Sequence, residues 1–125
     1  MGGIAYFEIQ VDDPERALAF YGDVFGWRFV KQDGLPVAYW RIETDGMHGG
    51  LLQRPCPAPP LGQGTNAYVC SVGVDDFDAT AARIESLGGQ VALAKFAVPG
   101  LCWQGYFIDP EGNTFGLFQP DFDAG

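Results

Sequence analysis

The sequence predicts an α+β domain built from two βαβββ modules, and three observations support this prediction. The stretch VDDPERALAFYGDVFGW at residues 11–27 is echoed by VDDFDATAARIESLGGQ at residues 74–90. Strand-like segments surround both stretches in the same order. The ends of the two halves also match, since GGLLQ at residues 49–53 resembles FGLFQ at residues 115–119. A duplicated strand, helix and three strands explains all three observations.

The first module is predicted from one strand pattern, one helix pattern and three further strands. Residues 4–11 alternate, with Phe7, Ile9 and Val11 on one face and Tyr6, Glu8 and Gln10 on the other. Asp12 or Asp13 is a suitable N-cap, Pro14 suits the first helical turn, and Gly26 provides the stop. Strands are then expected at residues 27–31, 37–43 and 48–53.

The second module follows the same order. A strand is expected at residues 67–74, then a helix capped by Asp75 or Asp76 and ended by Gly88 and Gly89. Three strands follow at residues 90–96, 101–108 and 114–119. The Pro-rich residues 54–64 predict a linker between module 1, about residues 1–53, and module 2, about residues 65–120. A four-stranded sheet with one helix leaves a face bare, so we expect both modules to form a single domain over residues 1–125.

Composition excludes several classes of protein. The 16 acidic and 7 basic residues give a net charge of −9, which disfavours nucleic acid and anionic membrane surfaces as partners. No apolar run is long enough to span a bilayer, and the first residues lack the order of a signal peptide, so we expect a cytoplasmic protein. The 3 cysteines share no CxxC spacing, which argues against a disulfide framework or a zinc knuckle.

Four segments, in this order along the chain, resemble the vicinal oxygen chelate superfamily of glyoxalases, bleomycin- and fosfomycin-resistance proteins and extradiol dioxygenases. They are FEIQVDDPERALAFYGDVFGW, NAYVCSVGVDD, ESLGG and YFIDPEGNTFGLFQ. The resemblance covers nearly the whole chain. It implies a glyoxalase/bleomycin-resistance-like eight-stranded fold that curls around a cleft, and often a homodimer.

The resemblance also implies where a metal would be held. Members of the superfamily usually bind a divalent metal through His and Glu in the first and last strand of each module. The corresponding positions here are Tyr6, Gly50, Val69 and Gly116. Three of these have no donor side chain, and a phenol is a poor ligand unless it is deprotonated. We therefore expect no family metal site and no cofactor.

Glu8 and His48 are the candidate catalytic residues, because they share the strand parity of Tyr6 and Gly50. A carboxylate and an imidazole in one cleft are suited to proton transfer. His48 also fits an exposed histidine beside the Asp45-Gly46 turn. Glu8, between two large apolar residues, is costly to bury unless a cavity solvates it or a hydrogen bond holds it.

The candidate substrate-binding residues are hydroxyls and indoles in predicted strands. They are Tyr6, Ser71, Thr114, Trp40 and Trp103. Strand hydroxyls commonly satisfy neighbouring backbone groups, and strand aromatics are commonly core residues, so both alternatives stay open.

Two functions are compatible with these features. The first is metal-free binding of a small apolar or aromatic compound, as in the drug-resistance relatives. The alternative is a lyase-, isomerase- or dioxygenase-type enzyme related to lactoylglutathione lyase, either metal-free through Glu8 and His48 or with a non-standard metal site. The expected partners are a small-molecule ligand and a second copy of the chain.

Overall fold

The computed structural model describes residues 1–60, 62 and 64–125, and these divide into two compact units. The N-terminal unit is Tyr6–Tyr68, and the C-terminal unit is Met1–Ala5 together with Val69–Gly125. Together they contain eight strands and two helices, so the α+β class is confirmed. The predicted linker, residues 54–64, includes Leu61 and Gln63, which lie outside the described residues.

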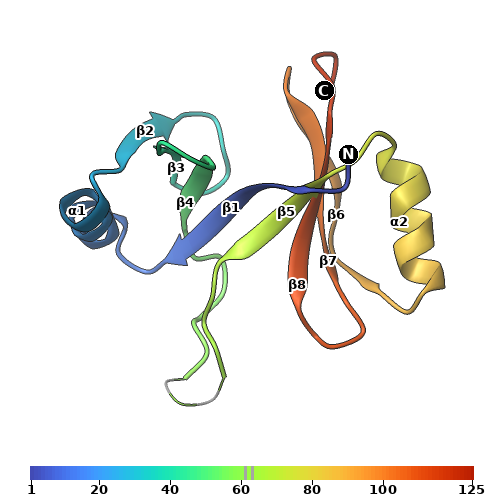
Figure 1. Ribbon diagram of the computed structural model, residues 1–125, viewed down its shortest axis with the longest axis horizontal. Coiled ribbons are helices and arrows are strands. Elements are labelled where there is room, and N and C mark those ends of the chain that lie inside the picture. The colour runs from blue at the N-terminus through green and yellow to red at the C-terminus, as the bar shows by residue number, and fades with distance from the viewer. Residues whose placement is uncertain (61, 63) are drawn as a thin grey trace. The chain divides into compact units, whose positions relative to one another are not determined.

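The N-terminal unit contains most of β1 and the four elements that follow it in Figure 1. These elements are β1 (Ile4–Val11), α1 (Pro14–Phe25), β2 (Arg28–Gln32), β3 (Tyr39–Glu43) and β4 (Gly49–Gln53). The strands are ordered β2-β3-β4-β1, with β1 parallel to β4 and the other pairs antiparallel. β3 starts at Tyr39 and not at the predicted residue 37, because its partner β2 ends opposite Tyr39.

The C-terminal unit repeats this plan. Its elements are β5 (Val69–Gly73), α2 (Phe77–Ser86), β6 (Gln90–Val98), β7 (Cys102–Ile108) and β8 (Thr114–Pro120). The strands are ordered β5-β8-β7-β6, and β5 is parallel to β8. The two βαβββ modules predicted from the repeat are therefore confirmed, with the same internal strand order.

The helix caps follow from local sequence. The Asp13 carboxylate accepts a hydrogen bond from the Arg16 backbone N–H at 3.2 Å, and Asp76 caps α2 in the same way through Ala79 at 3.0 Å. Gly26, at φ 71°, ends α1 in the left-handed conformation that glycine adopts without strain. Of the described helices, α1 has 12 residues and α2 has 10, and neither is long and apolar enough to cross a membrane.

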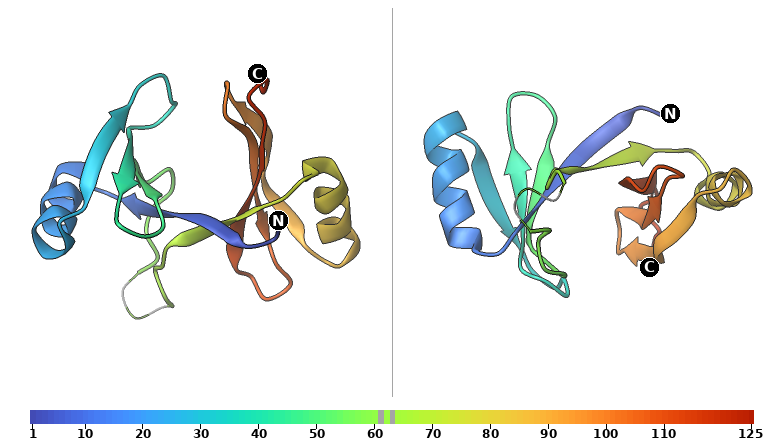
Figure 2. Two further views of the ribbon diagram at one scale, coloured as in Figure 1. Left: turned by 45° about the horizontal axis from the view of Figure 1, so that its top comes forward. Right: turned by 90° about the horizontal axis from the view of Figure 1, so that it is seen from below.

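Each unit has its own apolar core, formed by side chains of its sheet and its helix. Figure 2 shows each helix beside the strands of its own unit. Ile42 and Leu51 are fully buried at the centre of the N-terminal core, and Phe7, Val11 and Trp40 pack around them. The C-terminal core is built from Val74, Phe77, Phe107 and Leu117. Burial of one such side chain contributes about 1.5–3 kcal/mol. On the opposite face of the N-terminal sheet lie the even-numbered side chains of β1. On the opposite face of the C-terminal sheet lie the odd-numbered side chains of β5.

Candidate functional site

A buried carboxylate marks the face of the N-terminal sheet opposite its core. Glu8, in the middle of β1, is only 6% exposed. One of its carboxylate oxygens, Oε2, accepts a hydrogen bond from the Tyr39 hydroxyl of β3 at 2.9 Å. We call the surface formed by Tyr6, Glu8, Tyr39 and Gly50 the Glu8 face.

Gly50 allows this contact, since β4 lies between β3 and β1. Gly50 is paired in register with Glu8 on one side and with Arg41 on the other. The three atoms nearest to a Cβ built at Gly50 all belong to Tyr39, and the hydroxyl oxygen would overlap it. Tyr39 therefore crosses its neighbouring strand through the space that only a glycine leaves open.

The C-terminal unit contains the same arrangement with neutral groups. Gln104 of β7 donates a hydrogen bond from Nε2 to the Ser71 hydroxyl of β5 at 3.3 Å. Ser71 pairs in register with Gly116 of β8, where a Cβ would overlap the Ser71 hydroxyl oxygen. Ser71 is fully buried and Gln104 is 2% exposed. By register, Ser71, Gly116 and Gln104 are the counterparts of Glu8, Gly50 and Tyr39.

The two copies differ in what they can do chemically. An amide and a hydroxyl neither gain nor lose a proton near neutral pH. A carboxylate beside a phenol can accept a proton or bind a hydrogen-bond donor of a ligand. Acid–base chemistry between such partners is therefore available to the Glu8 face and is missing from the Ser71–Gln104 contact.

The four positions implied for a metal do not fit a divalent ion. At Gly50 and Gly116, the space of any side chain is already taken by Tyr39 and by the Ser71 hydroxyl. Val69 has no donor atom. No cluster of three or more His, Cys, Asp or Glu side chains forms among residues 1–60, 62 and 64–125. The donor chemistry thus differs from the His and Glu set that the resemblance implies.

His48 lies outside the strand in which it was predicted, because β4 begins at Gly49. It is exposed in the loop before β4. Its charge belongs to the group of cations that lowers the pKa of Glu43, chiefly through the hydrogen bond that Arg41 donates at 2.9 Å and least through His48. No hydrogen bond or ion pair joins His48 to Glu8 in the described part of the chain, so their action as a catalytic pair remains a prediction.

The two tryptophans predicted to bind a substrate lie on the core faces. Trp40 packs against the N-terminal core, with Lys31 Nζ 5.1 Å from the ring centroid. Trp103 packs against the C-terminal core and donates a hydrogen bond from Nε1 to Asp121 at 3.0 Å. Neither indole shares the sheet face of its unit's buried polar contact, because strand alternation points it to the opposite side.

The remaining predicted residues differ in exposure. Tyr6 is half-buried on the Glu8 face, Ser71 is buried beside Gln104, and Thr114 is exposed at the start of β8. Sequence reasoning missed Tyr39 and Gln104 as the partners of Glu8 and Ser71. A signal was present for Tyr39, since Trp40 and Ile42 have the parity of the core and so place Tyr39 on the opposite face.

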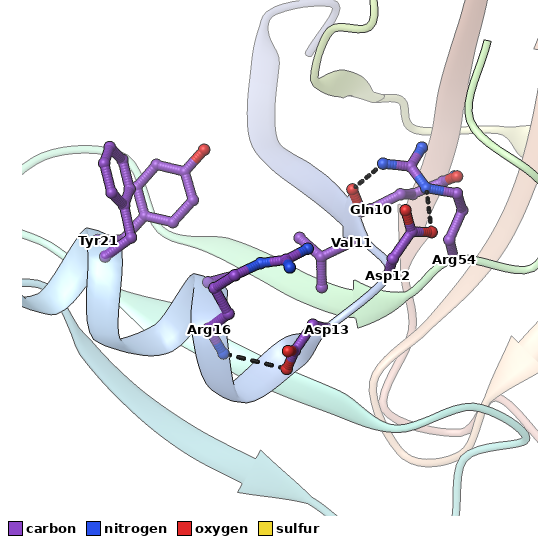
Figure 3. Close-up of a pocket in the computed structure, with 9 residues that line it drawn as sticks. Gln10, Val11, Asp12, Asp13, Arg16, Tyr21 and Arg54 are labelled. Atoms are coloured by element: carbon purple, nitrogen blue, oxygen red, sulfur yellow. Dashed lines mark hydrogen bonds and ion pairs between the residues drawn. The ribbon is translucent and has the colours of Figure 1, made fainter. Parts of the chain in front are cut away.

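A pocket of about 340 Å³ lies elsewhere in the N-terminal unit, at the first turns of α1, and Figure 3 shows it. No motif in the sequence predicted it. It is lined by Gln10, Val11, Asp12, Asp13, Arg16, Ala17, Phe20, Tyr21 and Arg54. Beside it, the Tyr21 and Tyr68 hydroxyls lie 2.8 Å apart, and burial together with this hydrogen bond raises the pKa of Tyr21 to about 12.

The most similar curated relatives include two longer bacterial proteins. The chain is 31% identical over 121 residues to "Putative glyoxylase CFP32" of Mycobacterium tuberculosis, with 95% of this chain and 44% of that protein covered. It is 27% identical over 129 residues to the anthracycline biosynthesis protein DnrV of Streptomyces peucetius, with 94% and 47% covered. The chain thus spans less than half the length of these relatives.

Solved structures share the fold at low identity. The hypothetical protein BH1468 of Bacillus halodurans aligns with a TM-score of 0.72 at 16% identity, covering 99% of this chain and 98% of that one. Methylmalonyl-CoA epimerase of Mycobacterium tuberculosis aligns with a TM-score of 0.69 at 19% identity, covering 95% and 88%. A family profile matches residues 3–117. The chain belongs to the glyoxalase/bleomycin resistance protein/dioxygenase superfamily.

Proposed function

We propose that this chain binds a small apolar or aromatic molecule on the Glu8 face, with Glu8 as the polar recognition group and without the divalent metal of its relatives. The observation behind this proposal is the buried Glu8 carboxylate, held by the Tyr39 hydroxyl across Gly50. A ligand bound on the Glu8 face would also contact Tyr6, beside Glu8 and Tyr39.

The energetics favour a functional role for Glu8. Transfer of a carboxylate from water into a protein interior is costly, and an apolar residue of similar volume is often as stable or more stable. The counterpart in the second module is the uncharged Ser71, so the module fold does not require a charge at this place.

The relatives support a small-molecule role. The superfamily description includes bleomycin resistance, and one relative is named for anthracycline biosynthesis. Since the chain spans 44% of the CFP32 protein and 47% of DnrV, the activity of those whole proteins extends to this chain only as part of the proposal. The proposal also includes a homodimer located in the cytoplasm. Sedimentation of the purified chain would test the dimer.

Acid–base catalysis is the second candidate, and the same carboxylate favours it. A buried Glu8 with a phenol at 2.9 Å can take a proton from a bound substrate, and Tyr39 can donate to the charge that develops. His48 would act from its loop as a second group. The names glyoxylase and epimerase among the similar proteins support a lyase- or isomerase-type reaction. A non-standard metal site would be the remaining variant of this candidate.

A ligand screen on matched variants tests the proposal. Small apolar and aromatic compounds are screened for thermal stabilisation of the native chain, since a compound at 100 times its dissociation constant adds about 2.7 kcal/mol. Hits are then titrated against Glu8→Gln, which keeps the shape and removes the charge. The control is Glu85→Gln, an exposed carboxylate on α2.

We expect Glu8→Gln to weaken binding of the hits at least tenfold and Glu85→Gln to leave it unchanged. Equal affinities in a folded Glu8→Gln protein would make Glu8 structural. Elemental analysis separates the metal-free form of the proposal from the alternative, because a stoichiometric, tightly bound divalent metal would overturn it. Hits that are converted to product by the native chain, and not by Glu8→Gln, would establish the enzyme.

A further inference from the structure

The pocket at the first turns of α1 is a second place that can hold a small molecule. We call it the Arg16 pocket, and its nine lining residues are those given above and drawn in Figure 3. Its volume of about 340 Å³ lies at the lower end of the range for small-ligand sites, which is about 300–1,000 Å³. None of its lining residues belongs to the Glu8 face, so a ligand here would be independent of the proposed function.

Three of the four charged side chains in the Arg16 pocket are already engaged. Arg54 is 10% exposed, and it donates hydrogen bonds to the Asp12 carboxylate at 3.1 Å and to the Gln10 carbonyl at 2.9 Å. The Asp13 carboxylate accepts the Arg16 backbone N–H and caps α1. These contacts tie Arg54 and Asp12 to β1 and fix the start of α1, and Figure 3 draws them as dashed lines.

The fourth charged group of the Arg16 pocket is the guanidinium of Arg16. It is exposed, and within residues 1–60, 62 and 64–125 it makes no hydrogen bond or ion pair. A guanidinium presents a planar set of donors that matches the two oxygens of a carboxylate. The pocket thus offers one cation that has no protein partner among the described residues and is open to a bound anion.

The apolar part of the pocket comes from α1 and from Val11 at the end of β1. Phe20 is 56% exposed, and its ring meets that of Tyr21 edge-on at 5.2 Å. The Tyr21 hydroxyl is hydrogen-bonded to Tyr68, and the Tyr21 ring stacks on that of Trp27 with centroids 5.2 Å apart, so Phe20 is the more open of the two rings. Val11 and Ala17 complete this wall. A flat ring placed here would cover aromatic surface that water now contacts.

We propose that the Arg16 pocket binds a small aromatic carboxylate, with the carboxylate on the Arg16 guanidinium and the ring against Phe20 and Tyr21. Both halves of the ligand are needed. A neutral aromatic compound leaves the guanidinium without an anion, and an inorganic anion leaves the aromatic wall exposed. The chain's charge of −9 repels anions at long range, so recognition depends on this local contact.

The test uses 2-naphthoate as the probe and 2-naphthamide as its uncharged match, both titrated into the native 125-residue chain by calorimetry and by amide NMR. Arg16→Gln removes the charge, and Phe20→Ala removes the exposed ring. Arg28→Gln is the matched control, because Arg28 is an 81% exposed side chain of the same unit, 3.6 Å from Glu43 and outside the pocket. The location of the shifted amide signals separates this site from the Glu8 face of the proposed function.

We expect 2-naphthoate to shift the amide signals of α1's first turns, and Arg16→Gln and Phe20→Ala each to weaken its binding at least tenfold. The naphthamide should bind at the first turns of α1 at least tenfold more weakly, and Arg28→Gln should bind 2-naphthoate there like the native chain. The proposal is overturned if 2-naphthoate does not bind, if Arg16→Gln binds it as well as the native chain, or if the shifts map to the Glu8 face.

Discussion

Substitution of Gly50 by alanine should disrupt the contact that crosses β4. An added Cβ would overlap the Tyr39 hydroxyl, so the ring must move and the 2.9 Å hydrogen bond to Glu8 must break. Overpacking of this kind costs about 1–3 kcal/mol. Loss of a hydrogen bond to a charged group costs about 1.5–3 kcal/mol more. We therefore expect Gly50→Ala to lower the free energy of unfolding by about 2.5–6 kcal/mol.

A double-mutant cycle identifies the cause. All three atoms nearest to the added Cβ belong to Tyr39, so Tyr39→Ala removes the obstruction. In that background Gly50→Ala should be neutral or stabilising by about 0.5–1 kcal/mol, since alanine is favoured over glycine within a strand. The interaction energy between the two sites is then several times the ordinary departure from additivity, which is about 0.5 kcal/mol.

Urea unfolding followed by circular dichroism measures all four proteins. Gly46→Ala is the control, because the nearest atom to a Cβ at Gly46 is the Thr44 hydroxyl oxygen at 4.0 Å, and we expect it to change stability by less than about 0.5 kcal/mol. Additive effects of Gly50→Ala and Tyr39→Ala, or a Gly50→Ala protein as stable as the native one, would refute the proposed crossing.

Three further results are expected. The backbone N–H of Asn113, 2.9 Å from Asp109, is the main cause that lowers the pKa of this aspartate from its ordinary 3.8, so its stabilisation is present above that value and is lost as pH falls through the lower folded pKa. Asp109→Asn should thus flatten the fall of stability below about pH 4, and an unchanged acid profile would contradict this. Tyr68→Phe should move the pKa of Tyr21 from about 12 towards 10.0 but not fully to it, because burial is the larger cause; phenolate absorbance measures the shift, and no movement would remove Tyr68 as a cause. Phe107→Ala should cost about 3–5 kcal/mol, since this ring is 2% exposed in the C-terminal core, and a cost below about 1 kcal/mol in urea unfolding would show that the core closes over the gap.

Much of the fold could be predicted because its signals are local. Asp13 and Pro14 start α1 and Gly26 ends it within one short segment, so no distant residue is needed to read them. The alternation of β1 likewise placed Phe7, Ile9 and Val11 in the core and left Glu8 on the other face. The repeat then allowed the helix and the strands of the second module to be predicted in the same way.

The candidate site was harder to predict from the sequence, because it depends on which strands are neighbours in the sheet. The sequence showed that Glu8 needs a partner, but Tyr39, 31 positions away, reaches it only because β4 lies between them with glycine at the crossing. The sequence left Trp40 open between ligand binding and the core, and in the structure it packs against the N-terminal core. His48 shares the parity of Gly50, but β4 begins at Gly49, after His48. The alternation of side chains along a strand therefore does not predict where the His48 side chain points.

The sequence by itself therefore determined the two modules, their helices and which face of β1 carries the core side chains. Each of these is set by residues close together in the chain. Only the tertiary structure decided that Tyr39 holds Glu8, that Gln104 holds Ser71 and that Arg54 braces the Arg16 pocket through Asp12 and Gln10. The physical reason is that strand order and register, which bring these side chains within hydrogen-bond distance, are set by the packing of the whole sheet and not by any single segment.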